Sequence, residues 1–172
     1  MGIPWTTRSR GIHMRNAELI AELRTKTDKQ VRPNKKNILR GSMLCIDPGS
    51  TKLGYAHYVG GVLVNSGTLI ARSRFPHQRL KQLAEELRAF PPVDVLVTEY
   101  IHEPNWKTVA KSYKGLIKSI GCIVSNTDWK YCIEVAPVLW QDVIGERFVK
   151  GTDEEDALWI GEAMMTLANG SK

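Results

Sequence analysis

An apolar stretch that ends in a carboxylate and a tight turn, residues 43–56, constrains the fold of this chain most. Residues 43–47 (MLCID) have the composition of a buried strand, and Asp47 is the last of them. Pro48 and Gly49 favour a tight turn, after which residues 53–59 form a second strand-like run. Asp47 is therefore expected at the tip of a buried strand. A rigid carboxylate there can bind a metal ion or simply cap the turn.

The rest of the chain alternates strand-like and helical segments. We predict strands at 62–70, 93–99 and 130–135, and helices from Pro76 to Pro91, from Pro104 to Gly121, from Pro137 to Gly145 and from Thr152 onward. A helical link places the strand at 93–99 parallel to the first strand. The expected fold is α/β: a mixed five-stranded sheet, three antiparallel strands then parallel strands, flanked by helices.

Positive charge is concentrated at the N-terminus. Residues 1–40 hold ten Lys and Arg against three Asp and Glu, whereas residues 41–172 hold fourteen against fifteen. We predict a basic N-terminal extension over 1–42, partly disordered, with a short helix near 16–24 and a linker over 26–40, followed by one domain over 43–172. A basic arm favours a polyanionic partner such as nucleic acid, although a solvated leader would have the same composition.

Neither a membrane partner nor a secretory route is expected. No run of eighteen apolar residues predicts a membrane span, and the polar, basic N-terminus does not resemble a signal peptide. Cys45, Cys122 and Cys132 lack C-x-x-C spacing, so neither a disulfide framework nor a zinc site is expected. We expect a cytoplasmic protein, in the host cytoplasm if the protein is viral, with an organelle as the alternative.

Four carboxylates fall at the expected ends of three elements. Asp47 and Glu99 end the first and fourth strands, and parallel neighbouring strands would bring both to the same edge of the sheet. Asp153 and Asp156 lie three residues apart in the first turn of the last helix and share one face. Each alone could be a solvated strand end or a favourable charge at a helix N-terminus. Together, as oxygen ligands without His or Cys, they predict a Mg²⁺ or Mn²⁺ site.

This ordered set of motifs resembles the RuvC-type Holliday junction resolvases of the ribonuclease H-like nuclease superfamily. The matching segments are IDPGS at 46–50 with Gly54 and Tyr55, VTE at 97–99, YCIEV at 131–135, VIG at 143–145 and TDEEDAL at 152–158.

The resemblance implies a homodimer that makes paired nicks in a four-way DNA junction. It also implies that Asp47, Glu99, Asp153 and Asp156 ligate two divalent metal ions, Mg²⁺ or Mn²⁺, in each active site. These ions would lower the pKa of a water for attack on the phosphodiester and stabilise the leaving 3′ oxygen. One departure is that only residues 146–151 separate Gly145 from Thr152, where the family usually has a longer helical stretch. Some of the family's DNA-contacting lysines therefore have no counterpart.

A row of lysines and nearby aromatic residues are the candidate DNA contacts. Lys107, Lys111, Lys114 and Lys118 are spaced four, three and four residues apart, along one face of the predicted helix. A solvated helix face would show the same pattern. His102 stands where the family often carries an aromatic residue that stacks on bases, with Tyr100 and Trp106 nearby; a plain loop histidine is the alternative.

Three other functions remain open from the sequence. A nuclease of the same fold that cuts RNA–DNA hybrids, or branched or flap DNA, would use identical active-site residues. An actin-like or hexokinase-like phosphate-binding domain also carries a carboxylate in its first hairpin, but it needs a second, similar half. A non-catalytic nucleic-acid-binding protein on this fold is the third, and the presence of all four carboxylates argues against it.

Overall fold

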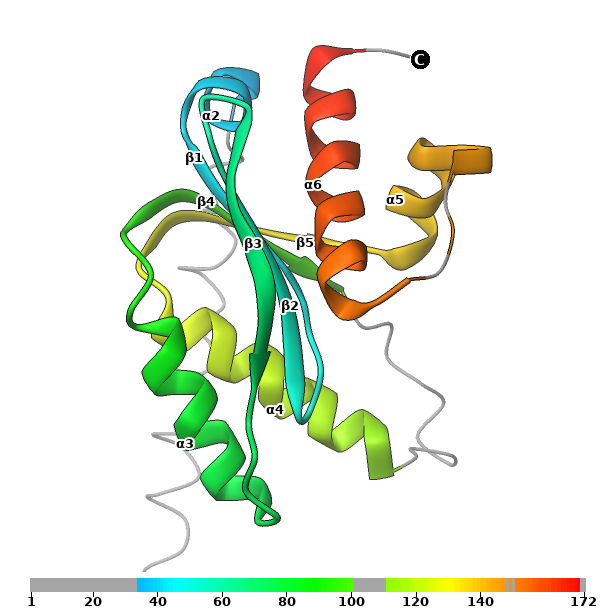
Figure 1. Ribbon diagram of the computed structural model, residues 1–172. Coiled ribbons are helices and arrows are strands. Elements are labelled where there is room, and N and C mark those ends of the chain that lie inside the picture. The colour runs from blue at the N-terminus through cyan, green and yellow to red at the C-terminus, as the bar shows by residue number, and fades with distance from the viewer. Residues whose placement is uncertain (1–33, 101–110, 148, 150, 171–172) are drawn as a thin grey trace, which may run out of the picture. The chain divides into compact units, whose positions relative to one another are not determined.

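The computed structural model describes residues 34–100, 111–147, 149 and 151–170. Five strands form one sheet: β1 (Ser42–Asp47), β2 (Lys52–Val59), β3 (Val62–Ile70), β4 (Val93–Glu99) and β5 (Trp129–Val135). Their order is β3-β2-β1-β4-β5 (Figure 1). β1, β2 and β3 pair in antiparallel fashion, whereas β4 runs parallel to β1 and β5 runs parallel to β4. This is the predicted ribonuclease H-like mixed sheet.

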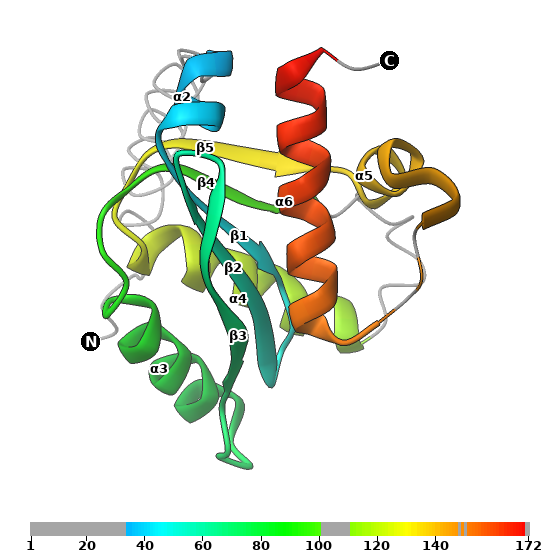
Figure 2. The same cartoon turned by 45° about the horizontal axis from the view of Figure 1, so that its top comes forward.

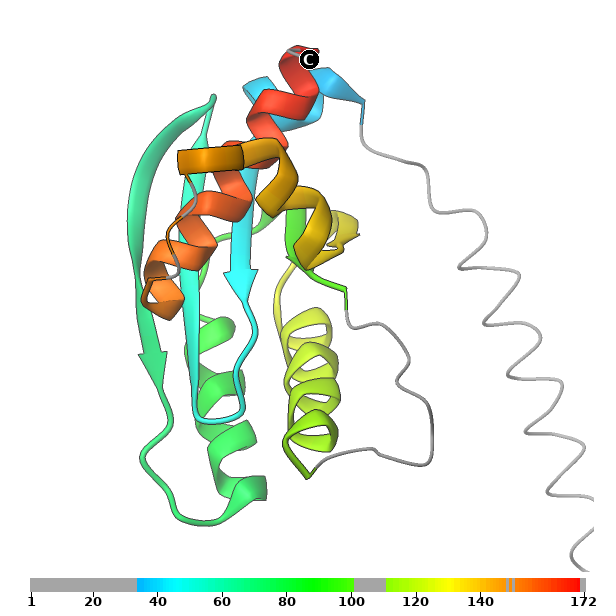
Figure 3. The ribbon, with the colours of Figure 1, turned by 90° about the vertical axis from the view of Figure 1, so that its right-hand side faces the viewer.

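Helices cover both faces of the sheet. They are α2 (Lys35–Arg40), α3 (Pro76–Leu87), α4 (Lys111–Asn126), α5 (Pro137–Ile144) and α6 (Asp153–Asn169), with a short 3₁₀ turn, η2 (Gly145–Arg147), after α5. Helices α3 and α4 contact each other, as do α5 and α6, and the two pairs are separate groups in the side view (Figure 3). Helix α6 lies across β1 and β2 (Figure 2).

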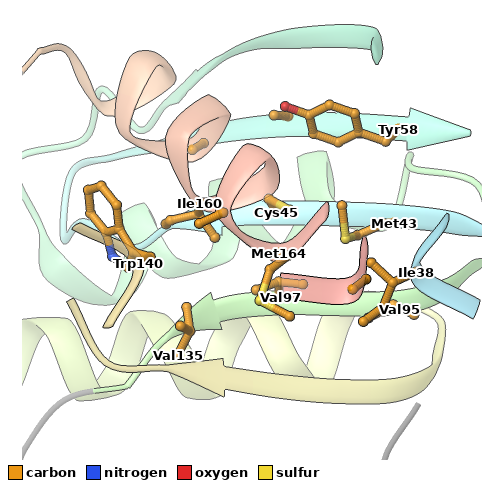
Figure 4. Close-up of a cluster of buried hydrophobic side chains, with 14 of the residues drawn as sticks. Ile38, Met43, Cys45, Tyr58, Val95, Val97, Val135, Trp140, Ile160 and Met164 are labelled. Atoms are coloured by element: carbon orange, nitrogen blue, oxygen red, sulfur yellow. The ribbon is translucent and has the colours of Figure 1, made fainter. Parts of the chain in front are cut away.

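The alternation of side chains along the strands builds two separate cores. On one face of β1 and β4, Leu44, Ile46 and Leu96 pack with residues of α3 and α4. On the other face, Cys45 and Val97 pack with residues of α2, α5 and α6 (Figure 4). Because β1 and β4 are buried on both faces, they are apolar nearly throughout, as expected of central strands in a helix-covered sheet.

The sequence prediction of a linker over residues 26–40 is wrong for its last part, which is helix α2 (Lys35–Arg40). Asn34 and Asn37 form a reciprocal capping box at its start. Ile38 is buried in the core beside α6. The predicted helix near 16–24 and the rest of the basic extension lie outside the described residues, so the boundary at residue 42 stays a prediction.

The predicted end of a helix at Gly121 is also wrong, because α4 continues to Asn126. Glycine lowers helix stability by about 1 kcal/mol relative to alanine, which burial of one large side chain can offset. Ile123, two residues further on, is fully buried between the sheet and α3. The packing of the last turn therefore outweighs the local preference of glycine.

Cys45, Cys122 and Cys132 are free thiols in this structure. No helix among the described residues is both long enough and apolar enough to cross a membrane.

Candidate active site

The first two carboxylates lie side by side at the ends of parallel strands. In the register of β1 and β4, Ile46 pairs with Thr98, so Asp47 and Glu99 are the next residues on their strands. Cys45 and Val97, two residues earlier, face α6 in the core. Because side chains two residues apart point to the same face, both carboxylates also face α6. The predicted convergence at one edge of the sheet is therefore present.

The other two carboxylates arrive at the same place on the first turn of α6. Thr152 caps this helix, since the Glu155 N–H donates to its hydroxyl and the Glu155 carboxylate accepts from its backbone N–H. Gly54 on β2 pairs with Asp47, and a Cβ atom at Gly54 would overlap the backbone carbonyl of Asp153. The missing side chain at Gly54 thus lets the start of α6 lie directly against the sheet beside Asp47.

Side chains of α3 and α4 donate hydrogen bonds to the turn that follows Asp47. The Ser119 hydroxyl, on a fully buried residue of α4, donates to the Gly49 carbonyl over 2.8 Å. The Arg79 side chain of α3 donates to the Ser50 carbonyl over 3.3 Å. A Cβ at Gly49 would also overlap the Lys52 carbonyl across the turn. These contacts fix the turn and, through it, the tip of β1.

Burial and neighbouring carboxylates raise the pKa values of Asp47 and Glu99. The pKa of Asp47 rises to about 8, first because the residue is largely buried and then because Glu99, Asp156 and Asp153 are close. Burial also raises the pKa of Glu99, and Asp156 adds to this. Such mutual repulsion between partly buried acids is typical of a site that holds a cation.

Two side chains offset this repulsion. The Trp140 indole N–H, on α5, donates to Glu99 Oε1 over 2.9 Å and lowers the pKa of that carboxyl. The Lys52 ammonium lies 2.7 Å from Asp153 Oδ2 and lowers the pKa of Asp47. The half-exposed Lys52 ammonium thus supplies a positive charge next to the four carboxylates.

The donor set fits a hard divalent ion, because all four side chains offer carboxylate oxygens and none offers nitrogen or sulfur. Within residues 34–100, 111–147, 149 and 151–170, however, no three His, Cys, Asp or Glu side chains are arranged closely enough to hold an ion. The predicted two-metal site therefore stays a prediction.

Of the predicted DNA contacts, only part lies in the described residues. Lys107, His102 and Trp106 fall outside them, and so does the side chain of Lys111. Lys114 and Lys118 are exposed on α4, one turn apart. Their neighbours Gly115 and Ser119 lie against the turn after Asp47. Tyr100, next to Glu99, is 38% exposed.

Sequence reasoning missed the residues that support the carboxylates. Gly54 and Lys52 lie within residues 43–56 but were not predicted to act in the site. Trp140 and Ser119 were not predicted to act in it either. An isolated Trp or Ser in a helix carries no sequence signal for a contact with a strand end far along the chain. A glycine in the middle of a strand pattern is the one available signal, because it often marks a close backbone approach.

If Glu99 ligates a divalent ion as predicted, replacing Trp140 by phenylalanine should weaken metal binding about 10- to 100-fold, the usual effect of losing a group that orients a ligand. The ring keeps most of its packing but no longer donates to Glu99, so the pKa of Glu99 should rise. Isothermal titration with Mn²⁺, compared with wild type, measures the effect. An unchanged affinity would show that the indole N–H does not matter for the site.

Comparisons with known proteins support the fold. No protein-family model matches this sequence, and no curated protein matches it. Among solved structures, Thermus thermophilus RuvC in complex with a Holliday junction substrate is similar at a TM-score of 0.56 and 13% identity, covering 75% of this chain and 94% of that one. A further Thermus thermophilus RuvC structure gives a TM-score of 0.54 at 13% identity, covering 75% of this chain and 95% of that one. The yeast mitochondrial Holliday junction resolvase gives 0.54 at 12%, covering 86% of each chain. The chain thus has a RuvC-type resolvase fold.

Proposed function

We propose that this protein is a metal-dependent endonuclease that resolves four-way DNA junctions by hydrolysing phosphodiester bonds. The observation that carries the proposal is the position of Asp47 and Glu99 on adjacent parallel strand ends, facing the first turn of α6 with Asp153 and Asp156. The similarity in fold to Holliday junction resolvases supports the choice of substrate.

In this proposal Asp47, Glu99, Asp153 and Asp156 hold two Mg²⁺ or Mn²⁺ ions. When bound, the ions would supply a water of lowered pKa and stabilise the leaving 3′ oxygen. Trp140 keeps the Glu99 carboxylate in position through its hydrogen bond. Lys52 neutralises Asp153 in this structure, and a bound divalent ion would supply that neutralisation in its place. Ser119 and Arg79 hold the turn after Asp47, so the strand tip does not move as charge changes around it.

The protein is proposed to act as a homodimer, because resolving a junction takes two opposed nicks and the described part of the chain holds one such carboxylate cluster. Lys114 and Lys118 would contact phosphates beside the site, and the basic residues of the N-terminal extension would add salt-dependent affinity.

The experiment that tests this function compares substrates. Labelled four-way junction, linear duplex, flap and RNA–DNA hybrid are each incubated with the protein in Mg²⁺, Mn²⁺ or EDTA. We expect paired, symmetric nicks in the junction that require the metal and are absent with EDTA. Cutting mainly of the hybrid or the flap would assign a different nuclease activity to the same site. Tight junction binding without cutting would indicate a non-catalytic binding protein.

A further inference from the structure

The loop that joins β3 to α3 is attached to the turn that follows Asp47. The Ala71 N–H donates to the Thr51 carbonyl over 2.8 Å. From the first turn of α3, which follows the loop, Arg79 donates to the Ser50 carbonyl. The loop therefore lies at the same end of the sheet as the candidate active site (Figure 1). A polymer bound across the carboxylates can reach it.

The backbone of this loop is held by its own side chains. Arg79 Nη1 donates to the carbonyls of Ser73 and Arg74, each over 3.2 Å. The Ser73 hydroxyl donates to Gln78 and accepts from the Phe75 N–H. The loop thus has a defined conformation without any contribution from the Phe75 ring.

Three planar side chains stack on the outside of this loop. The Arg74 guanidinium carbon lies 4.9 Å from the centroid of the Phe75 ring. The His77 ring lies 6.0 Å from the same centroid at an angle of 28°. Phe75 is 44% exposed, and residues 72–81 contain four Lys and Arg and no Asp or Glu. The net charge of this segment is therefore positive, whereas residues 41–172 as a whole are nearly neutral.

Phe75 is also a poor residue for its local position. It is the N-cap of α3, and it makes no capping hydrogen bond, whereas Ser, Thr, Asp or Asn would stabilise the helix there. A residue that breaks a local rule while its ring stays 44% exposed is expected where function requires it. Helix capping therefore does not explain the phenylalanine.

We propose that the Arg74–Phe75–His77 stack binds a nucleic-acid strand on its way to or from the carboxylate site, with an unpaired base stacked on the planar groups. Aromatic and guanidinium planes bind bases of any sequence in this way, and nearby basic side chains bind the phosphates. Arg72 and Arg74 are the exposed cations at hand. A branch point supplies bases that can leave the duplex stack. This inference rests on the proposed function for its choice of ligand.

The test measures the affinity of the full chain for a fluorescein-labelled four-way DNA junction in EDTA, by anisotropy. Phe75→Leu keeps an apolar side chain but loses the planar ring, and should weaken binding about 5- to 100-fold. Phe75→Trp keeps a planar ring and should bind as the wild type does. Arg74→Gln should also weaken binding. Leu63→Ala shortens a similarly exposed apolar side chain of β3 and should have no effect.

The outcomes separate this inference from the proposed function. If Phe75→Leu binds as tightly as Phe75→Trp, the stack is not a binding site, whatever the wild type cleaves. If Phe75→Leu binds weakly and the wild type cleaves nothing, the binding site stands and the nuclease proposal fails. If the wild type binds no junction at all, both fail. The thermal unfolding midpoint of Phe75→Leu should match wild type, because the ring is exposed.

Discussion

An Asp47→Asn variant is expected to lose metal-dependent cleavage and yet to be more stable than the wild type at pH 8. Asp47 lies close to the other three carboxylates, whose charges raise its pKa, so it is central to the candidate metal site. Its replacement should therefore abolish cleavage. An amide cannot replace the negative charge that a divalent ion needs. Cleavage of the four-way junction should fall to the level seen with EDTA.

The gain in stability follows from the raised pKa of Asp47. In the unfolded chain this carboxyl ionises near pH 3.8, whereas in the folded protein its pKa is about 8. Between these values the folded state holds more protons than the unfolded state, so the free energy of unfolding falls as pH rises from about 4 to 8 and then levels off. At about 1.4 kcal/mol for each pKa unit, the loss by pH 7 is of the order of 2–4 kcal/mol.

Urea unfolding at pH 5 and pH 8 without metal measures this difference. The wild type should lose stability between the two values, and Asp47→Asn should lose much less, with Glu99 accounting for the remainder. Mg²⁺ should restore the wild type at pH 8 and leave Asp47→Asn unchanged. Asp142→Asn, which removes an exposed carboxylate of α5 outside the cluster, is the matched control. If the stability of the wild type, Asp47→Asn and Asp142→Asn depends equally on pH, the carboxylates do not lie close together.

Gly54→Ala is expected to reduce both stability and cleavage, although alanine normally suits a strand better than glycine. The new methyl group would overlap the carbonyl of Asp153, so the first turn of α6 must move away from β2. Overpacking of this kind costs about 1–3 kcal/mol of unfolding free energy. Moving Asp153 and Asp156 by about 1 Å should lower the rate of cleavage about 100-fold.

Gly121→Ala is the control for this substitution. A Cβ atom at Gly121 would contact nothing, and the residue lies within helix α4. The exchange should therefore stabilise the protein by about 0.5–1 kcal/mol and leave cleavage unchanged. Urea unfolding and junction cleavage are measured on both variants. If Gly54→Ala behaves like Gly121→Ala, α6 is not held against the sheet at Gly54.

Local sequence patterns determined most of the secondary structure. The central strands β1 and β4 are short and apolar and each ends in an acidic residue, and the capping box at Thr152 marks the start of α6. The patterns failed where packing decides, at the buried Ile123 beyond Gly121 and at the short helix α2, whose Ile38 is buried in the core. Burial and long-range contacts have no signature within a short window of sequence.

The sequence by itself also determined which residues are candidates for the site, because carboxylates at strand ends and in a first helical turn stand out by position. Only the tertiary structure decided how they meet. The register of β1 with β4 puts Asp47 and Glu99 on the face toward α6. The absence of a side chain at Gly54 lets α6 lie close to the sheet. The Trp140 hydrogen bond to Glu99 and the Lys52 ion pair with Asp153 offset part of the negative charge of the carboxylates. These contacts join residues far apart in the chain, so they exist only once the sheet and helices have packed.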